Sequence, residues 1–215
     1  MEAIPSREEW YAALARRQGG QVLQKLDSAT VAICGLGGLG SHIAQALARA
    51  GVGKLILIDF DTVDLTNIHR QQYRLSQIGR LKTAATEENL RDISPFLQVR
   101  VHPVRMTKAE VGPLLSGADV VCEAFDRAEA KAMLVDAVLN QLPDTYLVAA
   151  SGMAGFGPPN AIQTRRITPR FYLCGDGVSD ADLGIGLVAS RVMLCAAHQA
   201  HTVLRILTGQ TDRLE

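Results

Sequence analysis

The stretch with the clearest chemical potential is VAICGLGGLG, residues 31–40, in which an apolar segment leads into Gly35, Gly37 and Gly40. Between a strand and a helix, this spacing makes a tight turn and lets backbone N–H groups approach a phosphate at the helix N-terminus. The motif predicts a nucleotide-binding turn. It leaves open whether the nucleotide is a nicotinamide coenzyme or a triphosphate.

A carboxylate follows at a distance typical of ribose recognition. Asp59 ends the apolar segment KLILID, 24 positions after Gly35. Nucleotide-binding folds of this kind place an acidic residue about 20 positions after the glycine motif, where it accepts hydrogen bonds from ribose hydroxyls. Asp59 therefore favours adenosine binding, and still does not separate a dehydrogenase from an enzyme that uses ATP.

The next segment, DFDTVDLTNIHRQQYRLSQIGRLK at residues 59–82, is dense in charged side chains. A nicotinamide site needs an apolar slot for hydride transfer, whereas a site that breaks a phosphoanhydride needs fixed positive charge and a magnesium ion held by carboxylate. The segment favours ATP with Mg²⁺. Arg74 and Arg80 are left out of the candidate site because most charge runs are solvated surface.

The elements that position these residues are expected to alternate between helix and strand. Helices are expected near residues 7–17, 21–26, 39–50, 80–93, 107–116, 128–142 and 186–207, and strands near 30–34, 54–59, 97–104, 118–125, 145–151 and 161–166. The continuous apolar strands suit a parallel sheet covered on both faces. We therefore expect an α/β, Rossmann-like, doubly wound and mostly parallel sheet, with a helical N-terminal extension over 1–28 and a long C-terminal helix.

Two stretches interrupt this regular pattern. Residues 152–160 are dense in Gly and Pro, and residues 167–186, rich in polar and helix-breaking residues, are expected to form a crossover-type loop. A structureless loop of that length is usually functional or mobile. The whole chain, 1–215, is expected to be one domain.

Composition limits the environment and the partners. The 22 basic residues balance 22 acidic ones, so no net field recruits nucleic acid or an anionic membrane. The apolar C-terminal segment contains too many polar groups for a bilayer span, and the acidic N-terminus does not read as a signal peptide. The four cysteines contain no C-x-x-C pair, which predicts a reduced, cytoplasmic setting and neither disulfides nor zinc.

A resemblance to a known family rests on GLGGLGSHIAQALARAGVGKLILIDFDTVDLTNIHRQ, followed by GRLK and EAFDRAEAK. From about residue 16 to 209 the chain resembles the ThiF/MoeB/HesA family, bacterial relatives of ubiquitin-activating enzymes. VAASGMAGFG and YLCGD resemble the short ThiF-like branch, the adenylyltransferases for the sulfur carrier ThiS.

The resemblance implies roles for individual residues. The glycine turn, with Gly38 in it, would lie against the nucleotide, and Asp59 would bind the ribose. Three residues match the polyphosphate-binding positions of the family: Asn67, Arg70 and Lys82.

Two further roles are implied by the same comparison. Asp126 matches the magnesium-binding aspartate, so the catalytic set becomes Arg17, Arg70, Lys82 and Asp126. Arg17, with Arg16 as the alternative, would reach the phosphates from the N-terminal helix of the partner in a homodimer.

The implied reaction starts with attack by the C-terminal glycine carboxylate of a ubiquitin-like sulfur carrier on the α-phosphate of ATP. It gives an acyl-adenylate and pyrophosphate for thiamine biosynthesis, and a sulfur donor protein would then displace AMP. No protein base is needed, because a carboxylate is ionised at neutral pH. The alternatives are a MoeB-like activator of the molybdopterin carrier or of another small carrier and, from a different class, an NAD-dependent oxidoreductase.

Cys174 is a candidate for acyl or sulfur transfer. Many relatives bind zinc through two C-x-x-C pairs, but Phe171 stands where the first cysteine would be, so we expect no zinc. Placement in the expected 167–186 loop favours access to the Cys174 thiol. Neighbouring Asp176 and Asp180 oppose an activated thiolate. His198 and His201, three positions apart, are expected to serve packing rather than metal binding.

Overall fold

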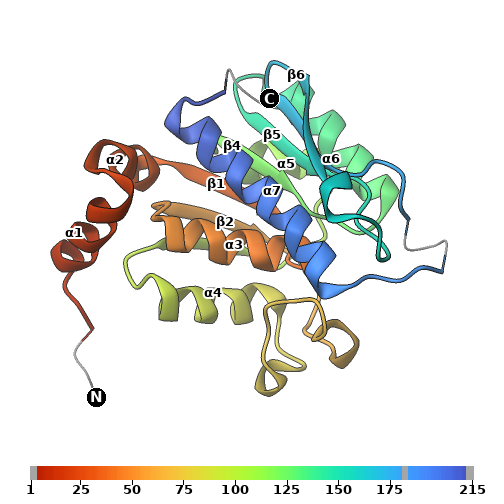
Figure 1. The fold of residues 1–215 in the computed structure, drawn as a ribbon, viewed down its shortest axis with the longest axis horizontal. Helices are drawn as coiled ribbons and strands as arrows, with labels where there is room; N and C mark the ends of the chain where they lie inside the picture. Colours follow the sequence, from red (N-terminus) through yellow and green to blue (C-terminus); the bar gives the residue numbers. More distant parts are fainter. Residues whose placement is uncertain (1–3, 181–183, 212–215) are drawn as a thin grey trace.

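A seven-stranded sheet forms the centre of the protein, as seen in the computed structural model, which describes residues 4–180 and 184–211 (Figure 1). The strand order is β3-β2-β1-β4-β5-β7-β6. The strands are β1 (Thr30–Cys34), β2 (Lys54–Ile58), β3 (Gln98–His102), β4 (Val120–Glu123), β5 (Tyr146–Ala150), β6 (Gln163–Thr168) and β7 (Phe171–Gly175). All neighbours pair in parallel except β6 and β7, which are antiparallel.

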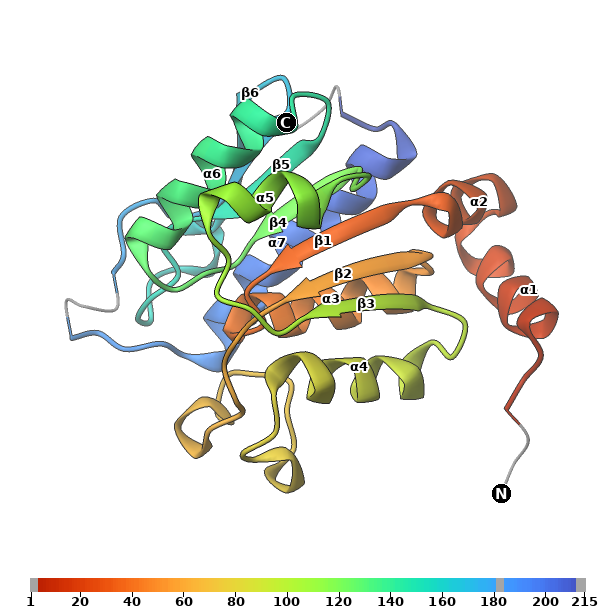
Figure 2. The same ribbon diagram turned by 180° about the vertical axis from the view of Figure 1, so that it is seen from behind.

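Helices cover both faces of this sheet. They are α1 (Arg7–Gln18), α2 (Gly20–Ser28), α3 (Gly38–Ala50), α4 (Lys82–Ile93), α5 (Lys108–Leu115), α6 (Ala128–Gln141) and α7 (Ala189–Thr208). Helices α3, α4 and α7 lie on one face, and α5 and α6 lie on the other (Figures 1 and 2). This confirms the expected doubly wound, mostly parallel α/β fold with a long C-terminal helix.

The central strand β1 explains why its sequence is apolar throughout. Val31 and Ile33 pack into the core under α3 and α7, whereas Ala32 and Cys34 face the core under α5 and α6. All four side chains are fully buried. A strand covered on both faces cannot alternate with polar residues, so the run VAIC is what a central parallel strand requires.

The N-terminal helices lie at the end of the sheet where the parallel strands begin (Figure 1). Helix α1 starts at the expected capping box, in which Ser6 and Glu9 bind each other's backbone N–H groups. A side chain at Gly51, after α3, would touch Leu14 of α1 and Leu23 of α2, so these helices cover the C-terminal end of α3.

The expected loop over residues 167–186 is wrong in its first half. Strand β7 lies inside it and pairs with β5 on one side and β6 on the other. The segment FYLCG is short and flanked by Pro169 and Gly177, which hides it in the sequence, but pairing on both edges stabilises it. Residues 181–183 of the expected loop lie outside the described residues.

Helix α4 also starts later than expected. Residues Arg80 and Leu81 run beside residues 61–63, with hydrogen bonds from the Val63 N–H to the Arg80 carbonyl and from the Lys82 N–H to the Asp61 carbonyl. The helix begins at Lys82, because the two preceding residues belong to this bridge.

Within the described residues, none of the helices combines the length and apolarity needed to cross a membrane.

The glycine turn packs too closely for any other residue at position 40. A Cβ on Gly40 would lie 1.8 Å from the Gly35 carbonyl oxygen, and one on Gly35, where φ is +96°, would lie 2.5 Å from the Ala124 carbonyl oxygen. The first turn of α3 therefore touches the end of β1 directly.

Gly40→Ala is expected to lower the free energy of unfolding by about 3 kcal/mol or to abolish folding, because backbone must move to admit the methyl group. Gly20→Ala is the control: nothing lies within 4 Å of its Cβ position, and the expected change is about 0.5 kcal/mol or less in either direction. Urea unfolding monitored by circular dichroism compares them. Equal stability of the two variants would contradict the close contact.

Candidate functional site

The candidate site lies where the strand order reverses. From β1 the chain moves outward through β2 to β3, and then returns to place β4 on the other side of β1. Ligands of open α/β sheets bind outside the carboxyl ends of the strands at such a point. The glycine turn follows β1, Asp59 follows β2 and Asp126 follows β4, so all three lie at the edge formed by the carboxyl ends of the strands.

The glycine turn is covered by α7 at Gly38 and has free space at Gly37. A Cβ on Gly38 would lie 2.8 Å from Val192 Cγ1 of α7, whereas one on Gly37 would have only Gln71 Nε2 nearby, at 3.7 Å. Gly37 is the N-cap of α3 and has no side chain to occupy the N–H groups of the first turn. The turn offers a helix N-terminus that fits a phosphate.

The Asp59 carboxylate is held in place by backbone N–H groups, one of them from the glycine turn. Its two carboxylate oxygens accept hydrogen bonds from the N–H groups of Leu36, at 2.6 Å, and Asp61, at 2.8 Å. Burial raises the pKa of Asp59, and the nearby Lys82 charge and these hydrogen bonds oppose that effect. Each oxygen keeps a lone pair, so the carboxylate can still accept from ribose hydroxyls.

The segment 59–82 folds back onto the glycine turn. Tyr73 donates a hydrogen bond from its hydroxyl to the Leu36 carbonyl, at 2.7 Å, and lies 3.0 Å from Thr86 Oγ1 of α4. Ser41 Oγ of α3 donates to the Gly37 carbonyl and accepts from the N–H of Gln72, at 2.7 and 3.1 Å. These bonds place the charged segment against the phosphate end of the turn.

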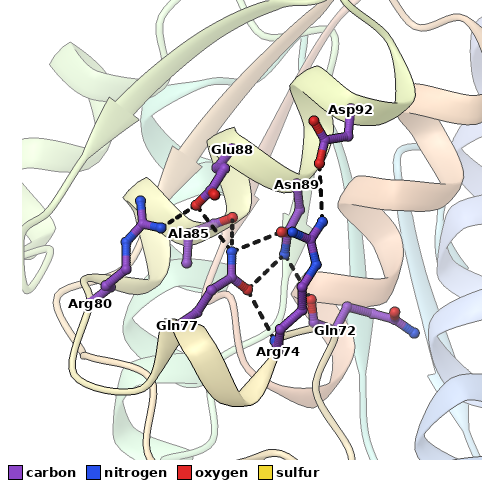
Figure 3. Close-up of polar contacts among 8 residues, drawn as sticks. All are labelled: Gln72, Arg74, Gln77, Arg80, Ala85, Glu88, Asn89 and Asp92. Carbon is purple, nitrogen blue, oxygen red and sulfur yellow. Dashed lines mark hydrogen bonds and ion pairs between the residues drawn. The ribbon is translucent and has the colours of Figure 1, made fainter. Parts of the chain in front are cut away.

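Figure 3 shows how residues 72–80 are held on α4. Gln77 Nε2 donates to Asn89 Oδ1 at 2.9 Å and to Glu88 at 3.2 Å. Arg74 pairs with Asp92 at 3.1 Å, and Arg80 pairs with Glu88. Arg74 and Arg80 lie on the surface as expected, but they are ion-paired with α4 rather than solvated singly.

Lys82 is a buried cation at the start of α4. Only 6 % of the residue is exposed, and its ammonium lies 2.9 Å from Asp61 Oδ2. A buried lysine with a carboxylate partner at the crevice supplies a fixed positive charge. The Lys82 charge also acts on Asp59, so the two groups lie near each other, and phosphate binding by Lys82 stays a prediction.

Arg70 and Asp126 approach each other from two different segments. Arg70 Nη1 donates to the Thr66 carbonyl at 3.1 Å. Burial lowers the pKa of the half-buried Arg70 guanidinium, and the charge of Asp126 partly opposes this effect. Asp126 is exposed just beyond β4. Asn67 ends a short 3-10 helix, η1 (Leu65–Asn67), one turn before Arg70. Binding of a triphosphate by Asn67 and Arg70, with a metal ion at Asp126, stays a prediction.

Two functional candidates were missed from the sequence, the first being Gln71. It is 8 % exposed, its Nε2 lies beside Gly37, and its Oε1 has no hydrogen-bond partner among the described residues. A buried amide left partly unpaired at the phosphate end is what a site for a bound nucleotide would contain. Its neighbour Arg70 was the only sequence signal.

The second missed feature is a buried ion pair beneath Asp126. Glu123 is 1 % exposed, accepts from the Phe125 N–H at 2.7 Å, and binds Lys131 Nζ of α6 at 2.9 and 3.1 Å. Lys131 also donates to the Ala150 carbonyl of β5 at 3.2 Å. The pair shapes the turn that carries Asp126. A charged residue inside the apolar run ADVVCEAF was the available signal.

Arg17 is the catalytic candidate that the single chain does not bring to the site. It lies in the last turn of α1, which packs at the C-terminal end of α3, whereas the glycine turn lies at the N-terminal end. Helix α3 has 13 residues and is about 20 Å long. A role at the phosphates would require Arg17 of a second copy.

Cys174 does not lie in a loop, and the expectation of access to its thiol is wrong. It is on β7, is fully buried and lies 3.5 Å from Thr164 Oγ1. Burial raises the pKa of Cys174 to about 11, so the thiol is neutral at physiological pH. The structure gives no support to acyl or sulfur transfer by this residue.

The metal predictions concern two different ions. Within residues 4–180 and 184–211, no group of three or more His, Cys, Asp and Glu side chains is arranged to hold a metal. Mg²⁺ in nucleotide sites needs less, usually one or two carboxylates with phosphates and waters. Asp126 with the phosphates therefore remains a candidate for Mg²⁺, and the absence of zinc remains a prediction.

Asp59 predicts a pH dependence. Its pKa is raised in the folded protein, so its share of the folding stability is largest at low pH and is lost as the pH rises through the folded pKa. ATP affinity should change in the opposite direction, falling as the pH drops through that pKa, because a protonated carboxyl is a weaker acceptor. Calorimetry from about pH 4 to 8 checks this.

The Asp59→Asn variant should bind ATP weakly and without this acid limb. Asp144→Asn, which changes a 97 % exposed side chain between α6 and β5, should keep the wild-type profile. An unchanged acid limb in the Asp59 variant would contradict the assignment.

Glu123→Gln should destabilise the fold by about 3 kcal/mol, because it leaves the Lys131 ammonium without its charged partner. Adding Lys131→Met should recover part of the loss. Glu129→Gln changes an exposed residue of the same helix and should cost about 0.5 kcal/mol or less. Chemical unfolding measures all of them, and equal costs for Glu123 and Glu129 would contradict a structural pair.

The chain is similar in sequence to proteins of known activity. The chain is 34 % identical over 152 residues to the tRNA threonylcarbamoyladenosine dehydratase of Bacillus subtilis, covering 70 % of this chain and 59 % of that protein. It is 27 % identical over 204 residues to the adenylyltransferase and sulfurtransferase UBA4 of Lodderomyces elongisporus, covering 88 % and 43 %. The chain therefore spans about half the length of these relatives.

A solved structure has the same fold over nearly its full length. The E. coli tRNA N6-threonylcarbamoyladenosine dehydratase, in complex with ATP, has a TM-score of 0.85 at 24 % identity, covering 97 % of this chain and 98 % of that one. The ThiF family model matches residues 11–214. Because this match covers nearly the whole chain, the chain belongs to the ThiF family.

Proposed function

We propose that the protein is an ATP-dependent adenylyltransferase that activates a carboxylate. The substrate that we propose is the C-terminal glycine of a ubiquitin-like, ThiS-like sulfur carrier in thiamine biosynthesis, in the cytoplasm. The observation that supports the proposal is a cluster of residues at the carboxyl ends of β1 and β2. There the open N-terminus of α3 and the buried carboxylate Asp59 lie near two cations, Arg70 and Lys82.

The reaction joins one carboxylate oxygen of the substrate to the α-phosphorus and breaks the bond from that phosphorus to the bridging oxygen, so that pyrophosphate leaves. The attacking carboxylate is already ionised, so positioning and charge stabilisation do the catalytic work. Gly37 and Gln71 would line the phosphates, Asn67, Arg70 and Lys82 would bind them, and Asp59 would hold the ribose.

Magnesium bound by Asp126 would neutralise charge on the departing phosphates. Asp126 is exposed at the crevice beside Arg70, which fits this task. Lys82 pairs with Asp61 in the described structure and would bind phosphate oxygens when ATP is present. Arg17 would complete the set from a second copy in a homodimer, and a sulfur donor protein would later displace AMP.

Several other readings compete with this one. The clustered cations argue against an NAD-dependent oxidoreductase, which needs an apolar slot for the nicotinamide. A MoeB-like activator of the molybdopterin carrier would share every residue named above. The 34 % identity to a tRNA threonylcarbamoyladenosine dehydratase favours a second candidate, a carboxylate carried by tRNA. In each carrier or tRNA case the shared chemistry is carboxylate adenylation.

The central experiment is ATP–pyrophosphate exchange in the presence of Mg²⁺. The substrates are a ThiS-like carrier ending in glycine, a molybdopterin carrier, and tRNA bearing threonylcarbamoyladenosine. The ThiS-like carrier should support exchange and yield an acyl-adenylate by mass spectrometry, and the same carrier without its last glycine should not.

Lys82→Met and Asp126→Asn should each reduce this exchange by roughly 100-fold, because each removes charge stabilisation of the departing phosphates. Lys108→Met, on a surface ion pair between α5 and α6, should leave it unchanged. Exchange with tRNA alone would replace the carrier by the second candidate. Stabilisation of the fold by NADH but not by ATP would overturn the proposal.

A further inference from the structure

A cavity lies past the ends of β5 and β7. It has a volume of about 440 Å³ and lies between residues 154–157, the turn at Asp176–Ser179 and the start of α7. Arg191 lines it, and the next residue, Val192, is the one that packs under Gly38 of the glycine turn. Arg191 therefore lies one position along α7 from the side chain that contacts the glycine turn.

One ion pair joins the three segments around this cavity. Arg191 Nη2 of α7 lies 2.6 Å from Asp176 Oδ2, and the two side chains are 6 % and 7 % exposed. Arg191 Nη1 also donates to the carbonyls of Gly157, at 2.7 Å, and Pro158, at 3.1 Å. The guanidinium therefore fastens the glycine-rich segment to α7 and to the turn after β7.

Asp176 organises its own turn in the same way. Its Oδ1 accepts from the N–H groups of Val178, at 2.9 Å, and Ser179, at 2.8 Å. Ser179 Oγ then accepts from the N–H of Ala154, at 3.0 Å. Burial opposes ionisation of Asp176, but these hydrogen bonds and Arg191 lower its pKa overall, so the pair stays charged.

The contacts leave little room for adjustment. A Cβ on Gly157 would lie 3.1 to 3.4 Å from the guanidinium, and a Cβ on Gly152 would lie 2.0 Å from Asp176 Oδ1. The backbone thus passes close to both charged groups, and at Gly152, where φ is +82°, a side chain would collide with the Asp176 carboxylate. Buried ion pairs are weak sources of stability compared with apolar packing, so the geometry that this one imposes is the more telling property.

The lining of the cavity suits the wall of a substrate site better than a phosphate site. The charge of Arg191 is paired with Asp176, and its N–H groups also donate to two carbonyls. Phe156 and Ile185, which line the cavity, are 87 % and 45 % exposed. A carboxylate that attacks the α-phosphate must be held beside the phosphate end of the nucleotide. Arg191, which lines this cavity, precedes the residue of α7 that contacts the glycine turn.

We propose that Asp176 and Arg191 are a positioning pair for the carboxylate substrate: they hold residues 154–157 as the wall that guides it toward the nucleotide. The inference rests on the proposed adenylation. Arg191 Nη1 is bound to the Gly157 carbonyl and Nη2 to Asp176, so the pair is not expected to bind ATP. Loss of the pair therefore affects the carboxylate substrate and leaves ATP binding intact.

Asp176→Asn is the first test, since asparagine can still accept from Val178 and Ser179 but presents no charge to Arg191. The KM for the carrier in pyrophosphate exchange should rise at least tenfold, while the Kd for ATP stays within about twofold of wild type. Amide hydrogen exchange of residues 154–158 should accelerate, as expected for a segment that has lost its anchor.

Arg191→Lys and Arg191→Met are the second test, and keep the proposal open to refutation if the Asp176 variant fails to fold. Lysine keeps the charge and should give an intermediate carrier KM, and methionine should match Asp176→Asn. Lys108→Met with Asp136→Asn removes an exposed ion pair between α5 and α6 and should change neither value.

The outcomes separate the inference from the proposed function. Carrier KM values unchanged in all pair variants, or equal losses for carrier and ATP, would overturn the positioning role. If the wild-type protein adenylates no substrate, the proposed function fails instead. Hydrogen exchange then still tests the anchor, and unchanged protection of residues 154–158 in Asp176→Asn would refute it as well.

Discussion

The hydrogen bond from the Leu36 N–H to the Asp59 carboxylate is the contact on which the site depends. It joins the turn after β1 to the end of β2, and the Gly35 N–H repeats the link by donating to the Ile58 carbonyl at 2.8 Å. Tyr73 adds a third connection at the Leu36 carbonyl. The glycine turn and Asp59 are therefore one preorganised unit, at the cost of burying a carboxylate whose pKa rises.

Much of the fold could be predicted because burial on both faces leaves a strong mark in the sequence. The runs at β1, β2 and β4 have no polar alternation, and a Cβ at Gly35 or Gly40 would collide with backbone. Strand β7 could not be found this way. Its five residues lie between breakers, and its stability comes from β5 and β6, which are neighbours in space. Because β7 was not predicted, Cys174 was wrongly expected to lie in a loop.

The candidate site was predictable in its residue types and less so in their use. Residues 59–82 are visibly rich in charge, but the sequence does not show how each charge is used. Arg74 and Arg80 form ion pairs with α4, whereas Lys82 is buried near Asp59. The pairs Glu123–Lys131 and Asp176–Arg191 join different elements, so no spacing rule finds them. Long-range polar contacts require the fold to be known first.

The antiparallel strand β6 gives the sheet a protected edge. Its residues alternate little in burial, Arg165 and Arg166 are exposed along it, and its register with β7 shifts between Arg166 and Thr168. Positive charge and an irregular register both discourage another strand from adding to an edge. Arg100 is exposed on β3, the opposite edge. Because both borders disfavour strand addition, a second copy of the chain is expected to join through helices or loops, and the sheet resists sideways growth into an aggregate.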